Sequence, residues 1–481
     1  MRTVSTVLVA AIVVGGMWAA VAWLPMFSES YTALALVRGF DGPLAAFDPS
    51  LVPFRPLQHL AFWLFDRIGA DPAVGRAVTF GLHGVSSLLV FAIAQRLGAS
   101  RRGAWLAFAL FLAFPTTKGL VWLAAISGPV RTCCLLTIVW ATIVWVQRPS
   151  AALGALIAGV FAVALGIHQS SVLAVPIVGL GILCLAPGTL AARLCAALRA
   201  LRCVPLLLAL LLAVGFALYV GTLQDRSYHG IAQRGAIVAN VARAALAFVP
   251  EWVRLPALEG LRSPSGSGGF VAALAVVAAI GIAWLGLLWR STSATRWLLV
   301  LIPLDLLLPV LTTGFVSRYA MFAAALLSIV LALQVERGAV GVVASRWRLA
   351  ACWLVVVAWG IDHVVDLVEV RAAGRTMERL LDDAAKARTA APPGRRIALI
   401  DAPDHAGGDD DVPVCNWGLG EALAARGIPG PWLLLRVDPC WTTSDHRRVS
   451  EQELAALAAD PELETLRFDP SAGGFVAWRP R

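Results

Sequence analysis

Residues 76–96 read RAVTFGLHGVSSLLVFAIAQR, an apolar run with an arginine at each end. About 20 apolar residues are enough to cross the hydrocarbon core of a bilayer as a helix, in which every backbone amide is bonded internally. The run therefore predicts a membrane-spanning helix. Similar runs occur along most of the chain.

The composition agrees with a protein that is mostly solvated by lipid. Of 481 residues, 59% are hydrophobic and 14% are charged, and the mean hydropathy is +0.77. Soluble domains have about 45–50% apolar and about 25% charged residues. Disordered, disulfide-rich and collagen-like chains are excluded. The net charge of +9 comes almost entirely from dispersed arginines, so it does not predict nucleic-acid binding, which needs a basic soluble face.

We predict a polytopic all-α membrane protein with about eleven spans. The runs are 4–24, 76–96, 103–117, 124–147, 151–167, 170–187, 204–222, 269–289, 297–315, 319–335 and 349–367. Packed membrane helices tolerate the prolines within them because neighbouring groups bond the freed carbonyls. Pro25 follows the first run in place of a small-residue cleavage site, which favours a retained helix over a cleaved signal.

The arginines near the helix ends predict the orientation, because positive residues remain cytoplasmic. With the N-terminus inside, the inner connections carry thirteen basic residues and one acid, Glu336. The basic residues are Arg2, Arg96, Arg101, Arg102, Arg148, Arg193, Arg199, Arg202, Arg290, Arg296, Arg337, Arg346 and Arg348. An odd number of spans places the C-terminus outside. We expect a multi-pass inner (plasma) membrane protein with a cytoplasmic N-terminus and an extracytoplasmic C-terminal domain.

Three regions are predicted along the chain. Residues 1–367 form the membrane domain with long outer loops at 25–75 and 223–268, 368–394 form a helical linker, and 395–481 form a small α/β domain. In the last region, strand patterns at 396–400 and 432–437 alternate with helix patterns at 418–426 and 450–459, before a hairpin of 465–468 with 474–478. Its two cysteines, Cys415 and Cys440, are a disulfide candidate in an oxidising compartment.

Three acids in the first outer loop are candidates for a general base. Glu29 follows the first span directly, where apolar neighbours and flanking serines would place a carboxylate between lipid and water. The alternative for Glu29 is an ordinary solvated loop acid. Asp41 and Asp48 have the same two interpretations, and each begins a turn-forming sequence.

Other polar groups lie in or beside the spans. Arg55, Lys118, Arg131 and Arg318, with Tyr319, fall at outer helix ends, which predicts binding of an anionic head group such as a phosphate. The alternative is side chains that reach toward water. Asp305 lies within a span and needs a partner or a hydrated cavity, so its alternative role is pairing with an arginine or a hydroxyl. His83 and His168 are either functional or hydrogen-bonded core residues.

No cofactor is evident from the sequence. It contains no P-loop and no GxGxxG after a strand, so ATP-driven chemistry is not predicted. No Cys/His spacing predicts a metal site, although dependence on a divalent ion stays open.

The order of short motifs resembles a known family. Phe54-Arg55-Pro56-Leu57, then Leu82-His83-Gly84-Val85, Phe114-Pro115, Val121-Trp122, Ser127-Gly128 and Ser317-Arg318-Tyr319 occur in this sequence. Together they are similar to polytopic glycosyltransferases of the C superfamily (GT-C), above all the dolichyl- or polyprenyl-phosphate-mannose enzymes and their bacterial relatives. Ile167-His168-Gln169 stands where these enzymes tend to have Lys-Glu before a proline.

The resemblance implies a membrane glycosyltransferase that moves a sugar from a polyprenyl-phosphate donor to a glycan, lipid or protein acceptor at the outer face. It implies that Glu29 occupies the place of the catalytic acid, usually an aspartate. The family's second acid is Gly119 here, and the arginine after Ser-Gly is Pro129, with Arg131 a shifted substitute.

Two alternatives follow from these departures and from Asp305. The missing second acid is compatible with a catalytically inactive membrane scaffold whose outer α/β domain binds a partner. An acid within a span is compatible with a secondary transporter or lipid flippase, although the repeated halves typical of transporters are not found.

Overall fold

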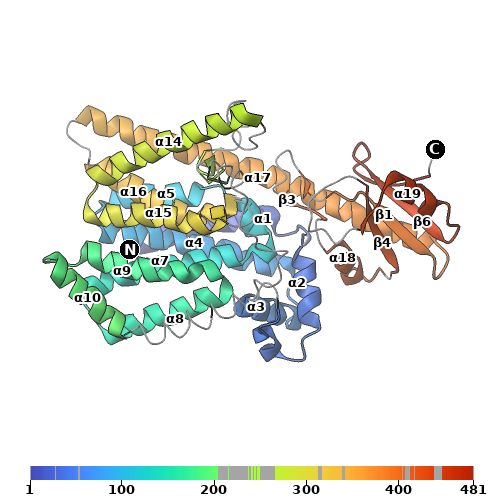
Figure 1. Cartoon of the computed structure of the whole chain (residues 1–481), viewed down its shortest axis with the longest axis horizontal. Coiled ribbons are helices and arrows are strands. Elements are labelled where there is room, and N and C mark those ends of the chain that lie inside the picture. The colour runs from blue at the N-terminus through green and yellow to red at the C-terminus, as the bar shows by residue number, and fades with distance from the viewer. Residues whose placement is uncertain are drawn as a thin grey trace.

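The computed structural model describes residues 2–27, 29–51, 55–203, 215, 237, 240–241, 243–244, 246–249, 266–311, 317–337, 342–403, 405–406, 412–415, 418–428, 430–437 and 447–479. Within these ranges the chain is a bundle of helices with a small α/β domain at one end (Figure 1). The polytopic fold class predicted from the sequence is confirmed.

The membrane helices coincide with ten of the eleven predicted spans. They are α1 (Arg2–Val21), α4 (Pro72–Arg96), α5 (Arg101–Ala113), α7 (Ser127–Gln147), α8 (Ala151–Ile167), α9 (Ala174–Leu185), α14 (Gly266–Arg290), α15 (Ser293–Leu311), α16 (Met321–Arg337) and α17 (Val342–Ala390). The predicted span 204–222 and the outer loop 223–268 lie almost wholly outside the described residues. α10 (Leu190–Cys203) follows α9 at the end opposite the α/β domain (Figure 1).

Several helices are shorter than predicted. Over the described residues, Pro72–Arg96, Leu123–Gln147 and Arg346–Ala390 are long and apolar enough to cross a membrane, and five further apolar helices are shorter. The predicted span 103–117 ends at Ala113 because Pro115 cannot continue the helix and disfavours helical backbone in the residue before it. α6 (Thr117–Val121) and η2 (Leu123–Ala125) follow it.

α4 is central to the bundle and packs against α1, α5, α7 and α16. Its buried face includes small residues such as Gly84 and Ala94, at which neighbouring helices can approach closely, as is usual in membranes. Fully buried Phe80 and Val90 lie on this face, and Gly84 is within contact distance of Val14.

The outer loop 25–75 is largely helical. It contains α2 (Glu29–Arg38), η1 (Pro43–Phe47) and α3 (Pro56–Arg67), which enclose their own small apolar core around Val37, Phe40 and Phe62. Residues 57–65 lie within α3. The ion pair between Arg38 and Asp66, at 2.8 Å, joins α2 to α3.

α17 is one uninterrupted helix of 49 residues. The sequence predicts a span ending at residue 367 and a helical linker over 368–394, and in the structure one helix continues through both. The composition changes from apolar to charged at this point, while good helix formers such as alanine, arginine and leucine continue. The helix therefore continues through the change from apolar to charged composition.

The C-terminal domain contains a five-stranded sheet of order β5-β4-β1-β6-β7. Its strands are β1 (Arg396–Ile400), β4 (Trp432–Arg436), β5 (Arg447–Arg448), β6 (Leu463–Asp469) and β7 (Gly474–Ala477), with α18 (Leu419–Ala425) and α19 (Glu451–Ala458). β1 is parallel to β4 and β6, and β7 is antiparallel to β6. The main strands, helices and hairpin lie where the sequence predicts them. The short pair β2 (His405–Ala406) and β3 (Val412–Pro413), and β5, are not anticipated.

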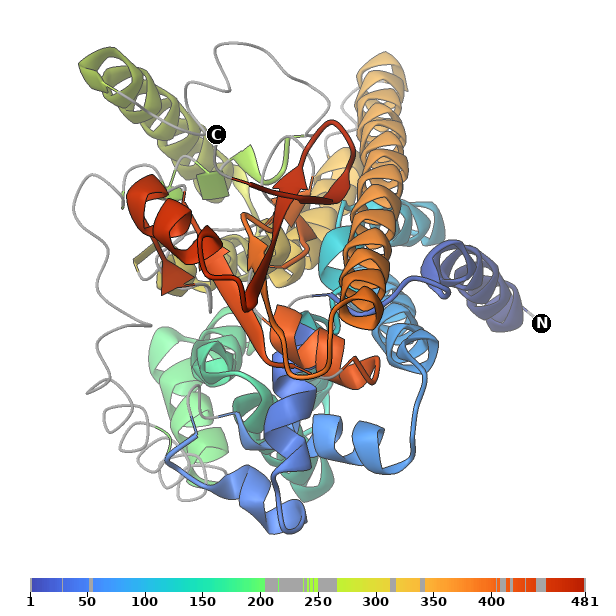
Figure 2. The same ribbon diagram turned by 90° about the vertical axis from the view of Figure 1, so that its right-hand side faces the viewer.

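The α/β domain lies at the same end of the bundle as α2 and α3 (Figure 2). α18 contacts α2, and β7 contacts the C-terminal half of α17. Arg426, beyond α18, makes an ion pair of 2.7 Å with Glu378 of α17. α2, which begins at the candidate base Glu29, is therefore adjacent to the α/β domain.

Candidate functional site

The site is built outward from Glu29, the first residue of α2. The backbone of Glu29 is helical, and its side chain lies outside the described atoms. The next residue, Ser30, is fully buried, and its Oγ accepts a hydrogen bond of 3.1 Å from the Ala124 N–H in η2. The start of α2 is thus fixed to the short turns that precede α7.

Ala124 continues the contact toward α3. Its carbonyl accepts a 2.9 Å hydrogen bond from Gln58 Nε2, and Gln58 Oε1 accepts one of 3.4 Å from Arg55 Nη1. Arg55 precedes α3 as its N-cap residue, and its Nη2 lies 3.5 Å from His168 Nε2. A polar route therefore runs from the start of α2 to the end of α8.

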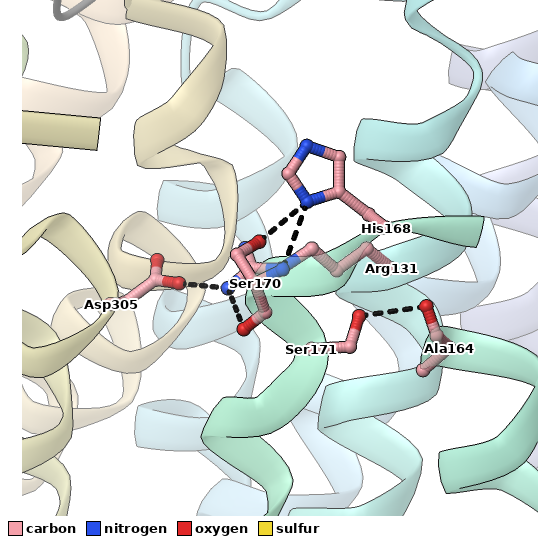
Figure 3. Close-up of polar contacts among 6 residues, drawn as sticks. All are labelled: Arg131, Ala164, His168, Ser170, Ser171 and Asp305. Atoms are coloured by element: carbon pink, nitrogen blue, oxygen red, sulfur yellow. Dashed lines mark hydrogen bonds and ion pairs between the residues drawn. The ribbon is translucent and has the colours of Figure 1, made fainter. Parts of the chain in front are cut away.

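The deeper half of this route is shown in Figure 3. His168 Nδ1 accepts from the Ser170 N–H at 3.2 Å and lies 2.7 Å from Ser170 Oγ, and the Ser170 carbonyl accepts from Arg131 Nη2 at 3.4 Å. Arg131, on α7, forms an ion pair with Asp305 of α15. Ser171 Oγ donates to the Ala164 carbonyl at 2.8 Å and fixes the turn after α8.

We call this set the outer polar chain: Ser30, Ala124, Gln58, Arg55, His168, Ser170, Arg131 and Asp305. Its Arg131–Asp305 end is buried, since the side chain of Asp305 is fully buried and that of Arg131 is 9% exposed. Arg55 and His168, in the middle of the chain, are half-buried. A guanidinium beside an imidazole at the rim of the bundle has the donors to bind a phosphate or carboxylate.

Asp305 and Arg131 are thus explained as a pair. An acid inside a membrane bundle is costly unless a cation and hydrogen bonds accompany it, and the guanidinium supplies both. The pairing of Asp305 with an arginine is one of the two roles that the sequence suggests for it. Arg131 therefore has a fixed buried partner in Asp305.

Lys118 has different partners from Arg55 and Arg131. Its Nζ lies 3.0 Å from Glu369 Oε2 and 3.6 Å from Asp366 Oδ1, both on α17. The structure therefore does not place Lys118 in the same group as the two arginines. The side chain of Arg318 lies outside the described residues, and Tyr319 is half-buried in η4 (Ser317–Ala320).

Asp41 and Asp48 are both exposed. The Ser50 N–H donates to Asp48 Oδ1 at 2.8 Å, which lowers the pKa of this carboxyl below its usual value. A carboxylate with a lowered pKa is a weaker base. Of the three acids, Glu29 alone adjoins a member of the outer polar chain.

His83, on α4, lies in a second buried polar group. Its Nε2 is 3.5 Å from the Leu112 carbonyl at the end of α5, and its ring contacts Phe111. His363 of α17 makes a hydrogen bond with Thr117 nearby. These contacts surround the end of α5, where carbonyls lack helical partners. Among the described residues, no group of three His, Cys, Asp or Glu side chains is placed to hold a metal ion.

Cys415 is buried, with its Sγ 3.6 Å from Met377 Sδ of α17. Cys440 lies outside the described residues, so the disulfide stays a prediction.

Sequence reasoning missed several of these groups. Asp366 lies inside the predicted span 349–367, where an acid is unusual enough to have been a signal. Gln58 and His363 carry no pattern that distinguishes them. Arg76 begins the quoted run 76–96, where an arginine is expected only as a flanking charge.

The helical bundle, the helical segment 29–67 and the terminal α/β domain together form a polytopic membrane fold. Crystal structures of ArnT from Cupriavidus metallidurans have this fold, one bound to undecaprenyl phosphate with a TM-score of 0.54 and one in the apo state with 0.52. Each is 12% identical in sequence and covers 98% of this chain and 93% of its own. No protein-family model and no curated protein matches the sequence. The GT-C resemblance is therefore confirmed for the fold.

Proposed function

We propose that this protein is a membrane glycosyltransferase that moves a sugar from a polyprenyl-phosphate-linked donor to a glycan, lipid or protein acceptor. The observation that carries the proposal is the outer polar chain, which connects the start of α2 with Arg55, His168 and Arg131. The ArnT fold supports the donor class, since one of those structures is bound to undecaprenyl phosphate.

In the proposed reaction Glu29 removes a proton from the acceptor hydroxyl, which attacks the sugar carbon as the phosphate leaves. A positioned general base contributes typically 10²–10⁴-fold to such a step. Arg55 and His168 bind the departing phosphate, because cationic donors already in place stabilise charge as it develops. The ion pair with Asp305 keeps Arg131 oriented behind them.

We also propose that this chemistry takes place at the outer leaflet. α2, α3 and the α/β domain share one end of the bundle, and the basic connections at Arg96, Arg101 and Arg102 belong to the other. The positive-inside rule supports a cytoplasmic position for the latter end. A lipid-linked donor supplies its own leaving group, so no nucleotide site is required.

The test uses the purified full chain in lipid nanodiscs with radiolabelled polyprenyl-phosphate sugars. Glu29→Gln is expected to lower turnover by about 10²-fold or more. Arg55→Gln is expected to lower it by about 10²-fold, the loss typical of one electrostatic donor. Arg38→Gln, which removes a charge of the same segment outside the outer polar chain, serves as the matched control and keeps its rate.

Unchanged turnover in Glu29→Gln would remove Glu29 as the base. If the unaltered protein turns over no polyprenyl-phosphate sugar, the inactive scaffold becomes the better interpretation.

A further inference from the structure

The Arg76 side chain is fully buried in the described bundle, with a relative exposure of 0%. It lies in the first turns of α4. Its Nη1 donates to the carbonyls of Val21 and Ala22, both at 3.2 Å, and also to that of Leu24. Nη2 donates to the Pro25 carbonyl, and Nε donates to Val121 at 3.3 Å.

Four of these acceptors, the carbonyls of Val21, Ala22, Leu24 and Pro25, lie at the end of α1 and in the turn that follows, and Val121 ends α6. The last carbonyls of a helix lack intrahelical partners and carry partial negative charge. One guanidinium satisfies several of them together. Its planar set of five donors suits this task, whereas a lysine ammonium has three donors at a single point.

α17 holds the opposite side of the same turn. A Cβ on Gly374 would lie 2.7 Å from Leu24 Cδ2, so the helix and the turn are in close contact there. Arg371 lies over the Trp23 ring, with its Cζ 5.4 Å from the ring centroid. Residues 22–27 are therefore fixed by α4 on one side and by α17 on the other.

The turn leads directly into α2. Phe27 is 2% exposed and lies against the Arg76 guanidinium, and its carbonyl accepts from the Ser30 N–H at 2.9 Å. Glu29 lies between the turn held by Arg76 and the Ser30 hydroxyl held by Ala124. Its backbone position is thus set from both ends.

We propose that Arg76 is a positioning residue for Glu29, acting through the backbone of residues 21–25. The proposal rests on the proposed function, in which Glu29 is the general base. Arg76 does not contact substrate in this mechanism. It restricts the turn so that the carboxylate meets the acceptor hydroxyl in the productive geometry. A misplacement of about 1 Å can lower the rate about 10²-fold.

The first experiment measures kcat and KM for the lipid-linked donor in Arg76→Lys, alone and combined with Glu29→Gln. Arg76→Lys is expected to lower kcat by about tenfold or more with donor KM unchanged, and to add no further loss in Glu29→Gln. A purely structural role predicts a lower unfolding temperature with kcat per folded molecule unchanged, or equal losses in both backgrounds. Either result would overturn the proposal.

A second pair of variants approaches the turn from α17 and leaves Arg76 in place. Gly374→Ala forces Leu24 to move, whereas Gly360→Ala on the same helix meets nothing within 4 Å. We expect the first to reproduce the kcat loss and the second to behave as the unaltered protein. Equal kcat values in the two variants would contradict the role of α17 in fixing the turn of residues 22–27.

A third readout does not depend on catalysis. Glu29→Cys is labelled from the outer side with a membrane-impermeant maleimide, with and without Arg76→Lys. A changed labelling rate supports the positioning role, and an unchanged rate overturns it. If Glu29→Gln retains full turnover, the proposed function fails at Glu29, while this labelling still decides whether Arg76 sets the position of residue 29.

Discussion

At the scale of residues, the Arg131–Asp305 pair is the sharpest case of buried charge. Removing one partner of such a pair leaves an uncompensated ion in a low-dielectric interior, which costs about 3–5 kcal/mol. Asp305→Leu is expected to destabilise the protein by that amount, measured by unfolding in detergent. Arg131→Met added to it is expected to recover most of the loss, because two apolar residues of similar volume need no partner.

The exposed pair Arg38–Asp66 is the control for this prediction, since the Arg38 side chain is 52% exposed. Asp66→Asn should cost less than about 1 kcal/mol. A comparable cost at both sites would mean that the Arg131 region is hydrated.

The residues of the site show how far sequence reasoning reaches. Asp305 and Arg131 are noticeable separately, because charge inside or beside a span is rare. That Arg131 is the partner of Asp305 could not be predicted, since the two are far apart in sequence and their contact depends on how α7 and α15 pack. Arg76 is hidden for another reason. An arginine at the start of a span has the pattern of an ordinary flanking charge, and only the fold brings the end of α1 to it.

At the scale of elements, α9 offers a direct test of close packing. A Cβ on Gly181 would lie 2.8 Å from both Thr142 Cγ2 of α7 and Trp297 Cζ2 of α15, whereas one on Gly179 meets nothing within 4 Å. Gly181→Ala is expected to destabilise the bundle by about 1–3 kcal/mol through overpacking. Gly179→Ala should be neutral or stabilising by up to about 1 kcal/mol, because alanine has the higher helix propensity.

Thermal unfolding in lipid nanodiscs measures both changes. If Gly181→Ala proved as stable as Gly179→Ala, α9 would pack more loosely than described.

The first turn of α19 predicts a pH effect. Ser450 and Glu453 form a capping box, and the hydrogen bond from the Ser450 N–H lowers the pKa of Glu453. Since the pKa of Glu453 is lowered in the folded state, its contribution is present above the unfolded pKa of about 4.3 and is lost as pH falls through the lower folded value. The protection factors of the amides in 450–458, measured by hydrogen exchange, should therefore fall over that acidic window.

Ser450→Ala should weaken the same turn at neutral pH by about 1 kcal/mol, the usual cost of losing an N-cap. Exchange in α18, which has no side-chain cap, is the internal reference and should not change. No effect of the substitution on 450–458 would contradict a stabilising role for the cap.

Element positions are largely predictable because periodicity and apolar length are local properties. The eleven apolar runs and the strand–helix alternation after residue 395 illustrate this. The segment 368–394 is predicted as a helical linker, but its continuity with the preceding span in one helix is not predictable in this way. A charged segment after a span has the composition of a solvated linker, and its contacts with the α/β domain are what keep it beside the sheet.

At the scale of the whole molecule, the fold predicts a sidedness that labelling can test. In intact bacterial cells, Ser471→Cys in the α/β domain should react with an impermeant maleimide added outside. Arg102→Cys, at the exposed start of α5, should react only after the cells are opened. The reverse pattern would invert the proposed topology and place the outer polar chain in the cytoplasm.

The length of α17 has a consequence for how this protein can change. At about 1.5 Å per residue, its 49 residues span about 74 Å without a joint. A flexible tether would absorb an inserted residue, but in a continuous helix each insertion turns everything beyond it by about 100°. One extra residue near 368 would rotate the α/β domain away from α2. Seven extra residues, close to two whole turns, would return the domain to its original orientation about the helix axis but farther from the membrane helices. Insertions that change the distance between the bilayer and the α/β domain therefore preserve the orientation of the domain when they add whole helical turns, and not when they add single residues.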